Sequence, residues 1–197
     1  MEDLKRQQQI EHHRAEIRRL QEEARPATTS SWPPSGFYLT WHVMVGMVLG
    51  VLAAAVSLSA NLLAAPLFGH RPLDLIRAYL TFPMGARALT LESGMTLTIG
   101  CVLYLATGAV LGVFVHLILA VFFRDVPTAR RFAIASVLGL GIWIVGFYLI
   151  LSWLQPMLLG GSWIVSSIPW WVAMLTHLAF AWSMAAGESF GHDRWAS

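Results

Sequence analysis

Residues 37–65 read FYLTWHVMVGMVLGVLAAAVSLSANLLAA and contain no Asp, Glu, Lys or Arg. A helix crosses a bilayer with about 20 apolar residues, so this stretch is long enough to span one. Near its start, His42, Gly46 and Gly50 follow one another at four-residue spacing. Residues four apart lie on one face of a helix, so we predict a transmembrane helix with these three side by side.

A second apolar stretch, residues 94–123, carries the same residue types in reverse order, as Gly108, Gly112 and His116. Two successive spans joined by a short connection run antiparallel, so the reversed order predicts His42 beside His116 at similar depth. Glycines spaced by four are typical of helices whose backbones approach closely. We therefore predict that the four glycines of the two stretches form a helix-packing contact.

The composition is that of an integral membrane protein. The chain is 56% apolar and only 12% charged, against about 25% charged residues in soluble domains. Its mean hydropathy is +0.61. The first 35 residues are polar and lack the apolar run of a secretory signal, so we expect the first span to remain in the mature protein. Cys101 is the single cysteine, which excludes an intrachain disulfide and a thiolate metal cluster built by this chain alone.

These patterns predict an all-α integral membrane protein, an up-down bundle of four transmembrane helices. We expect two further helices outside the membrane core, one before the first span and one after it. The predicted parts are a helix at 1–25, a linker at 26–36, spans at 37–65, 94–123, 132–154 and 163–187, an external segment at 66–93, a basic loop at 124–131, a turn at 155–162 and a tail at 188–197.

The two helices outside the core differ in character. Residues 1–25 contain neither Gly nor Pro and carry a narrow apolar stripe, which fits either docking on a partner or a solvated helix with alternating charges. In the segment 66–93, Leu73, Ile76 and Leu80 share one helical face. This amphipathic pattern predicts a short helix that lies on the membrane surface.

The basic residues predict the orientation, because short cytoplasmic segments carry an excess of Lys and Arg. Ten of the 13 basic residues lie in the N-terminal segment, the loop 124–131 and the tail, and three lie in 66–93: Arg71, Arg77 and Arg87. We therefore expect both termini in the cytoplasm of a bacterium, with a multi-pass chain in its inner membrane and 66–93 on the outer side.

Three histidines, His42, His116 and His177, are expected in the cytoplasmic half of the membrane. Ionisable residues inside a membrane are rare and often functional. They could be axial ligands of a b-type haem, or hydrogen-bond a quinone headgroup. The structural alternative is that neutral histidines form hydrogen bonds between helices and so stabilise their packing. We expect no cofactor, with haem b or a quinone as the alternatives, and bound lipids between the helices. No metal site is expected.

The charges exclude several classes of transport protein. No predicted span has a buried Asp, Glu, Lys or Arg, and Glu92 and Glu188 are expected at the membrane edges. Proton pumps, ion-coupled transporters and voltage sensors need such groups inside the membrane. Motifs of zinc hydrolases, P-loop enzymes and serine hydrolases are also absent from the sequence.

We therefore expect a non-catalytic accessory subunit of a multi-subunit bacterial membrane complex, with respiratory or photosynthetic electron transfer as the favoured setting. Its partners would be other membrane subunits and the lipid bilayer, with no nucleic acid. The first alternative is a redox subunit that binds b-haem or a quinone through the intramembrane histidines. The second is a small channel or homo-oligomeric transporter.

Overall fold

A computed structural model of the chain describes residues 2–23, 36–92, 94–124 and 126–193. Within these ranges every regular element is a helix. The chain divides into two compact units, Met1–Tyr38 and Leu39–Ser197. Most of the predicted linker, residues 26–35, and the last four residues of the predicted tail lie outside the described ranges.

The first unit contains the helix α1, Glu2–Glu23, close to the bounds expected from its run of helix formers. The apolar stripe predicted for this helix is exposed, with Ile10, Ile17 and Leu20 each about half accessible or more. The described contacts on its surface are local, such as the ion pair between His13 and Glu16 at 3.8 Å.

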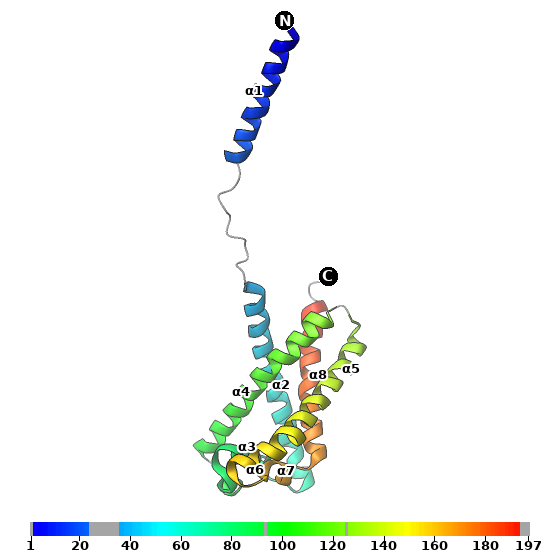
Figure 1. Ribbon diagram of the computed structural model, residues 1–197. Helices are drawn as coiled ribbons and strands as arrows, with labels where there is room; N and C mark the ends of the chain where they lie inside the picture. Colours follow the sequence, from blue (N-terminus) through cyan, green and yellow to red (C-terminus); the bar gives the residue numbers. More distant parts are fainter. Residues whose placement is uncertain (1, 24–35, 93, 125, 194–197) are drawn as a thin grey trace. The chain divides into compact units, whose positions relative to one another are not determined.

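Three helices of the chain are long and apolar enough to cross a membrane, and they make it an α-helical membrane protein. The first is α2, Phe37–Ala64, which is continued by the 3₁₀ turn η1, Ala65–Phe68, and the second is α4, Met95–Phe122. The third is a continuous helix, Thr128–Leu159 (Figure 1). It consists of α5, Thr128–Trp143, the π-helical stretch η3, Ile144–Leu151, and α6, Ser152–Leu159.

The third of these helices is longer than the predicted span 132–154. It begins directly after Pro127, whose extended backbone forms the N-cap, so Arg130 and Arg131 lie in its first turn and not in the loop. Arg131 is buried, and its Nη2 donates to the carbonyl of Arg124 at 2.9 Å. At the other end Gly160 adopts a left-handed conformation, φ 77°, which a glycine does without strain.

The segment 163–187, expected as one span, is divided. It forms the short helix α7, Trp163–Ser167, and the longer helix α8, Trp170–Asp193, which also takes in most of the predicted tail. The break has a local cause, because proline disfavours helical conformation at the residue before it, and Ile168 is extended with φ −106° and ψ 119°. Among the described helices α8 is not one of the three that are apolar enough to cross a membrane by composition.

The amphipathic segment after the first span forms α3, Asp74–Met84, followed by the 3₁₀ turn η2, Gly85–Thr90. Its apolar face does not lie free for the membrane surface as predicted. Ile76 and Leu80 are buried in a cluster with Leu58 of α2 and Leu97 of α4. The protein itself therefore covers this face.

The long helices of the second unit enclose the main core, and α3, α6 and α7 gather at one end of it, opposite the C-terminal end of α8 (Figure 1). Helix α5 runs along α8, where the Trp182 indole donates to Ser136 at 2.8 Å. The core cluster consists of buried residues from α2, α4 and α8: Ala53, Ala54, Val115, Leu119, Phe180 and Met184.

Candidate functional site

The close crossing of α2 and α4 depends on the absence of side chains at the paired glycines. A methyl group added to Gly46 would lie 2.7 Å from the Cα of Val113, and one added to Gly50 would lie 2.8 Å from the Cα of Gly112. A methyl group on Gly108 would lie 3.0 Å from the carbonyl oxygen of Gly50. Backbone atoms cannot rotate away as side chains do, so only glycine permits this approach.

The glycine crossing places His42 against His116. Gly46 follows His42 by one helical turn, and Gly112 precedes His116 by one turn, so the contact continues along both helices. The Nδ1 of His42 lies 3.0 Å from the Nε2 of His116, with ring centroids 5.2 Å apart. The neighbourhood predicted from the mirrored spacing is therefore present.

Glu188, on α8, adds a third member to this histidine pair. Its carboxylate bonds the Nδ1 of His116, and the side chains of His116 and Glu188 are only 5% and 14% exposed. The sequence had placed Glu188 at the membrane edge, outside the predicted span. Because α8 continues to Asp193, Glu188 lies within the helix instead and reaches His116.

The donors and acceptors of Glu188, His116 and His42 constrain where the hydrogens of these two bonds lie. An ionised carboxylate only accepts, so the Nδ1 of His116 carries the hydrogen that Glu188 accepts. When the His116 ring is neutral, its Nε2 is then an acceptor and His42 donates to it from Nδ1; when the ring is charged, Nε2 donates to His42 instead. The three residues thus form a continuous series of two hydrogen bonds, from Glu188 through His116 to His42.

The same distance decides against a haem between His42 and His116. A metal ion ligated by two imidazoles needs about 2.0–2.1 Å to each nitrogen, so about 4 Å between the two nitrogens. The observed 3.0 Å leaves no room for iron, and the other nitrogen of His116 is engaged with Glu188. The two residues do not fit the axial pair that the sequence had offered as one interpretation.

His177 lies apart from the other two histidines. It precedes Glu188 by 11 residues on α8, which corresponds to about 16 Å along the helix. Its Nδ1 bonds the carbonyl of Ala173 in its own helix at 2.7 Å. The structure therefore brings two of the three predicted site residues together and separates the third.

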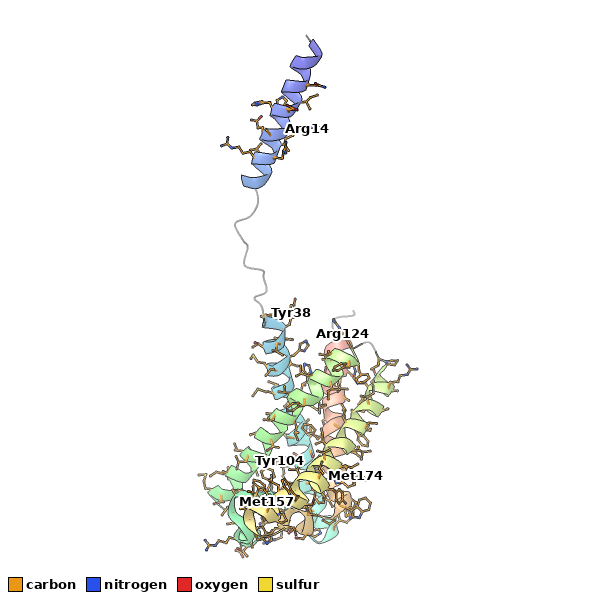
Figure 2. The ribbon with its side chains drawn as sticks, viewed as in Figure 1. Arg14, Tyr38, Tyr104, Arg124, Met157 and Met174 are labelled. Carbon is orange, nitrogen blue, oxygen red and sulfur yellow. The ribbon has the colours of Figure 1, made fainter. Side chains whose placement is uncertain are left out.

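The ring of His177 faces a cavity of about 550 Å³ in the second unit. The cavity is lined by α2, α3, α4, α5, η3, α7 and α8, and most of its wall is apolar. Figure 2 shows Tyr104, one of its lining residues, in the half of the bundle that holds α3, α6 and α7, and Arg124 at the opposite end. The π-helical stretch contributes Gly146, Phe147 and Ile150 to the wall, and such stretches are frequent at functional sites.

A smaller cavity, about 360 Å³, lies between α2 and α8 and includes Asn61 and Trp171 in its wall. In the described part of the chain no three His, Cys, Asp or Glu side chains are arranged to hold a metal ion. Cys101 is a free thiol, partly buried within α4.

Comparison with protein-family models, with curated proteins and with solved structures finds no match for this chain. The fold defines the class of the protein as an α-helical membrane protein.

Proposed function

We propose that this chain is an accessory subunit of a multi-subunit complex in a bacterial inner membrane, without a catalytic centre of its own, and that the complex carries out respiratory or photosynthetic electron transfer. In this proposal α8 is the fourth crossing. Its 24 residues extend about 36 Å, which matches a bilayer, and it packs along α5. The excess of basic residues in the N-terminal segment and the loop after α4 supports cytoplasmic termini.

The observation that carries the proposal is the exposure of the helix Thr128–Leu159. Only 17% of its most apolar window is buried within the chain, against 33% for each of the other two spanning helices. Gly141 on this helix has no neighbouring atom where a methyl group would stand, although glycine is unfavourable in a helix interior. A helix that packs little against its own chain and presents an open glycine fits a contact with another transmembrane helix.

Site-specific photo-crosslinking in native membranes tests this role. A benzophenone amino acid is placed at Val137 or Leu149, which are 70% and 68% exposed on the helix Thr128–Leu159. The matched control is Val102, 59% exposed on α4. We expect both positions on the third helix to attach to the same membrane protein, and Val102 to attach to lipid.

The contrary result is lipid adducts alone at all three positions, together with a chain that leaves the membrane in mild detergent as a lone monomer. Mass spectrometry of the adducts identifies the partner and shows whether its complex transfers electrons. A partner from a complex without redox cofactors would keep the accessory role and remove the electron-transfer setting.

A redox subunit remains the second candidate function, in one form only. The haem form that uses His42 and His116 conflicts with their 3.0 Å contact. The quinone form is supported by the apolar cavity at His177, because its volume falls within the roughly 300–1,000 Å³ of small-molecule sites and it combines apolar walls with a few polar groups.

A further inference from the structure

We propose that the cavity at His177 binds the reduced, hydroxyl-bearing form of a quinone-type lipid and discriminates against the oxidised form. This inference rests on the second candidate function above and is independent of the accessory role. It follows from an account of every polar side chain in the cavity wall: Tyr79, Tyr104, Thr107, Thr176 and His177.

His177 presents an acceptor to the cavity. The Ala173 carbonyl can only accept, so the Nδ1 of His177 carries the hydrogen of their 2.7 Å bond. In a neutral imidazole the other nitrogen, Nε2, then has a lone pair and no hydrogen. Among the described residues no hydrogen bond ends on this Nε2. The ring is ready to accept a hydrogen bond from a bound molecule.

The hydrogen of the Tyr104 hydroxyl is also used in a bond within the protein. The Ser57 hydroxyl donates its single hydrogen to the carbonyl of Thr176 at 2.9 Å. In the 3.3 Å contact between Ser57 and Tyr104, the donor must therefore be the Tyr104 hydroxyl. The Tyr104 oxygen retains a lone pair with which it can accept.

Thr176 follows the same pattern. Its hydroxyl donates to the carbonyl of Val172 at 2.7 Å and accepts from the amide of Asn61 at 2.7 Å. Its hydrogen is therefore already used within α8. Any further bond that Thr176 makes toward the cavity must use its oxygen as an acceptor.

The remaining two polar residues bond each other. The Tyr79 and Thr107 hydroxyls contact each other, and both lie within hydrogen-bond distance of the Leu103 carbonyl, at 3.5 and 3.0 Å. Whichever hydroxyl donates to the other, the second donates to the carbonyl, so both hydrogens are used within the protein. Every polar side chain of the wall thus offers acceptors and has no hydrogen left to donate. Since a carbonyl can only accept, an oxidised quinone finds no side-chain partner here, whereas the hydroxyls of a quinol find several.

The acceptors suit a ring with two hydroxyls, because they come from three different helices of the cavity wall. Tyr79 lies on α3, Tyr104 and Thr107 lie on α4, and Thr176 and His177 lie on α8. The aromatic rings of Tyr79 and Tyr104 meet edge to face, with centroids 5.9 Å apart. A hydroquinone carries its two hydroxyls on opposite sides of a flat ring, and its apolar tail suits the leucine, isoleucine and phenylalanine side chains that make up most of the wall.

Calorimetric binding to the full chain in lipid nanodiscs tests the inference. The probes are a benzoquinone with a ten-carbon tail in its reduced form, the same molecule oxidised, and the dimethyl ether of the reduced form, which keeps the shape without the donors. An unpaired buried polar group typically costs about 1–3 kcal/mol, so we expect the reduced form to bind about tenfold tighter or more than either of the other two.

A matched pair of variants locates the site. His177→Phe removes an acceptor, and within the described ranges the only hydrogen bond it breaks lies inside α8, so the bundle should fold. We expect it to reduce the preference for the reduced form several-fold. His70→Phe makes the same replacement in the wall of the smaller cavity and should leave the preference unchanged. Thr107→Val is a second test of the acceptor account and should also weaken binding of the reduced form.

Three results would overturn the inference: equal affinity for the reduced and oxidised probes, binding of the dimethyl ether as tight as that of the quinol, or displacement of the quinol by a sterol of higher affinity. Each is distinguishable from a failure of the accessory role, because that role is read out by protein crosslinks from the helix Thr128–Leu159. A chain that crosslinks to a partner and shows no preference for the reduced probe would retain the first proposal and lose this one.

Discussion

Replacing Gly50 with alanine should separate α2 from α4 and weaken the whole bundle. The added methyl group would stand 2.8 Å from the Cα of Gly112, and ordinary contact begins at 3.4 Å. The carbonyl oxygen of Gly108 would lie closer still, so the helices must move apart by more than 0.6 Å, the difference between these two distances. If α2 moves as a rigid body, the 3.0 Å bond between His42 and His116 lengthens beyond about 3.6 Å and is no longer a hydrogen bond.

The loss in free energy of unfolding is best measured against a matched control, Gly141→Ala. Overpacking costs about 1–3 kcal/mol, and loss of a hydrogen bond adds about 0.5–1.5 kcal/mol. Gly141→Ala changes the same residue type in a helix interior, at a point where a methyl group meets nothing within 4 Å. The gain in helix propensity, up to about 1 kcal/mol, is common to both variants and cancels in their difference. Gly50→Ala should therefore be less stable than Gly141→Ala by about 2–4 kcal/mol.

The assay is an SDS titration of the protein in mixed micelles, followed by tryptophan fluorescence, which gives the free energy of unfolding of each variant. Nitrogen-15 spectra of the histidine rings report the bond between His42 and His116 in the same samples. If Gly50→Ala and Gly141→Ala unfold within about 0.5 kcal/mol of each other, the margin expected of neutral surface changes, the close approach inferred at the glycines is wrong.

Five further substitutions, at four residues, have outcomes set by particular polar contacts, each measured as a change in the free energy of unfolding by the same titration. Glu188→Gln retains a neutral bond to His116 and should cost about 1 kcal/mol, whereas Glu188→Leu should cost about 1.5–3 kcal/mol; an unchanged stability of Glu188→Gln would contradict a charge-assisted bond. Gln155→Leu leaves the buried partners of the amide on α3 and α7 unpaired and should cost about 1–3 kcal/mol, and an unchanged stability would show that these bonds do not form. Arg77→Met removes a buried guanidinium that holds two backbone carbonyls and should cost about 2–3 kcal/mol. Asp74→Asn keeps an oxygen acceptor beside Arg77 at a side chain that is 33% exposed, so it should cost less than Arg77→Met, and the reverse order would refute the assignment.

Much of the local structure was predictable because it depends on short spacings. The absence of charge over residues 37–65 and 94–123 predicted two of the spanning helices, and α2 and α4 match them to within a few residues. The mirrored order of His42 and His116 about their glycines predicted their contact, since four-residue spacing keeps each set on one helical face.

Other features depended on how separate helices meet. Glu188 carries no local signal that would direct it to His116, because the two residues lie 72 positions apart and are joined only by the packing of α8 against α4. The apolar face of α3 looked like a membrane contact for the same reason. Amphipathicity shows that a face will be buried, and it does not show whether lipid or protein buries it.

Hydropathy and the positions of glycine are therefore enough to predict a helical membrane protein and the pairing of its first two spans. Each of these properties belongs to a single segment of the chain. Three other features depend on several helices at once. They are the distance of His177 from the other histidines, the bond between Glu188 and His116, and the cavity wall whose polar side chains have only acceptors to offer. They became visible only in the folded chain, because each hydrogen in that wall is assigned by a partner elsewhere in the structure.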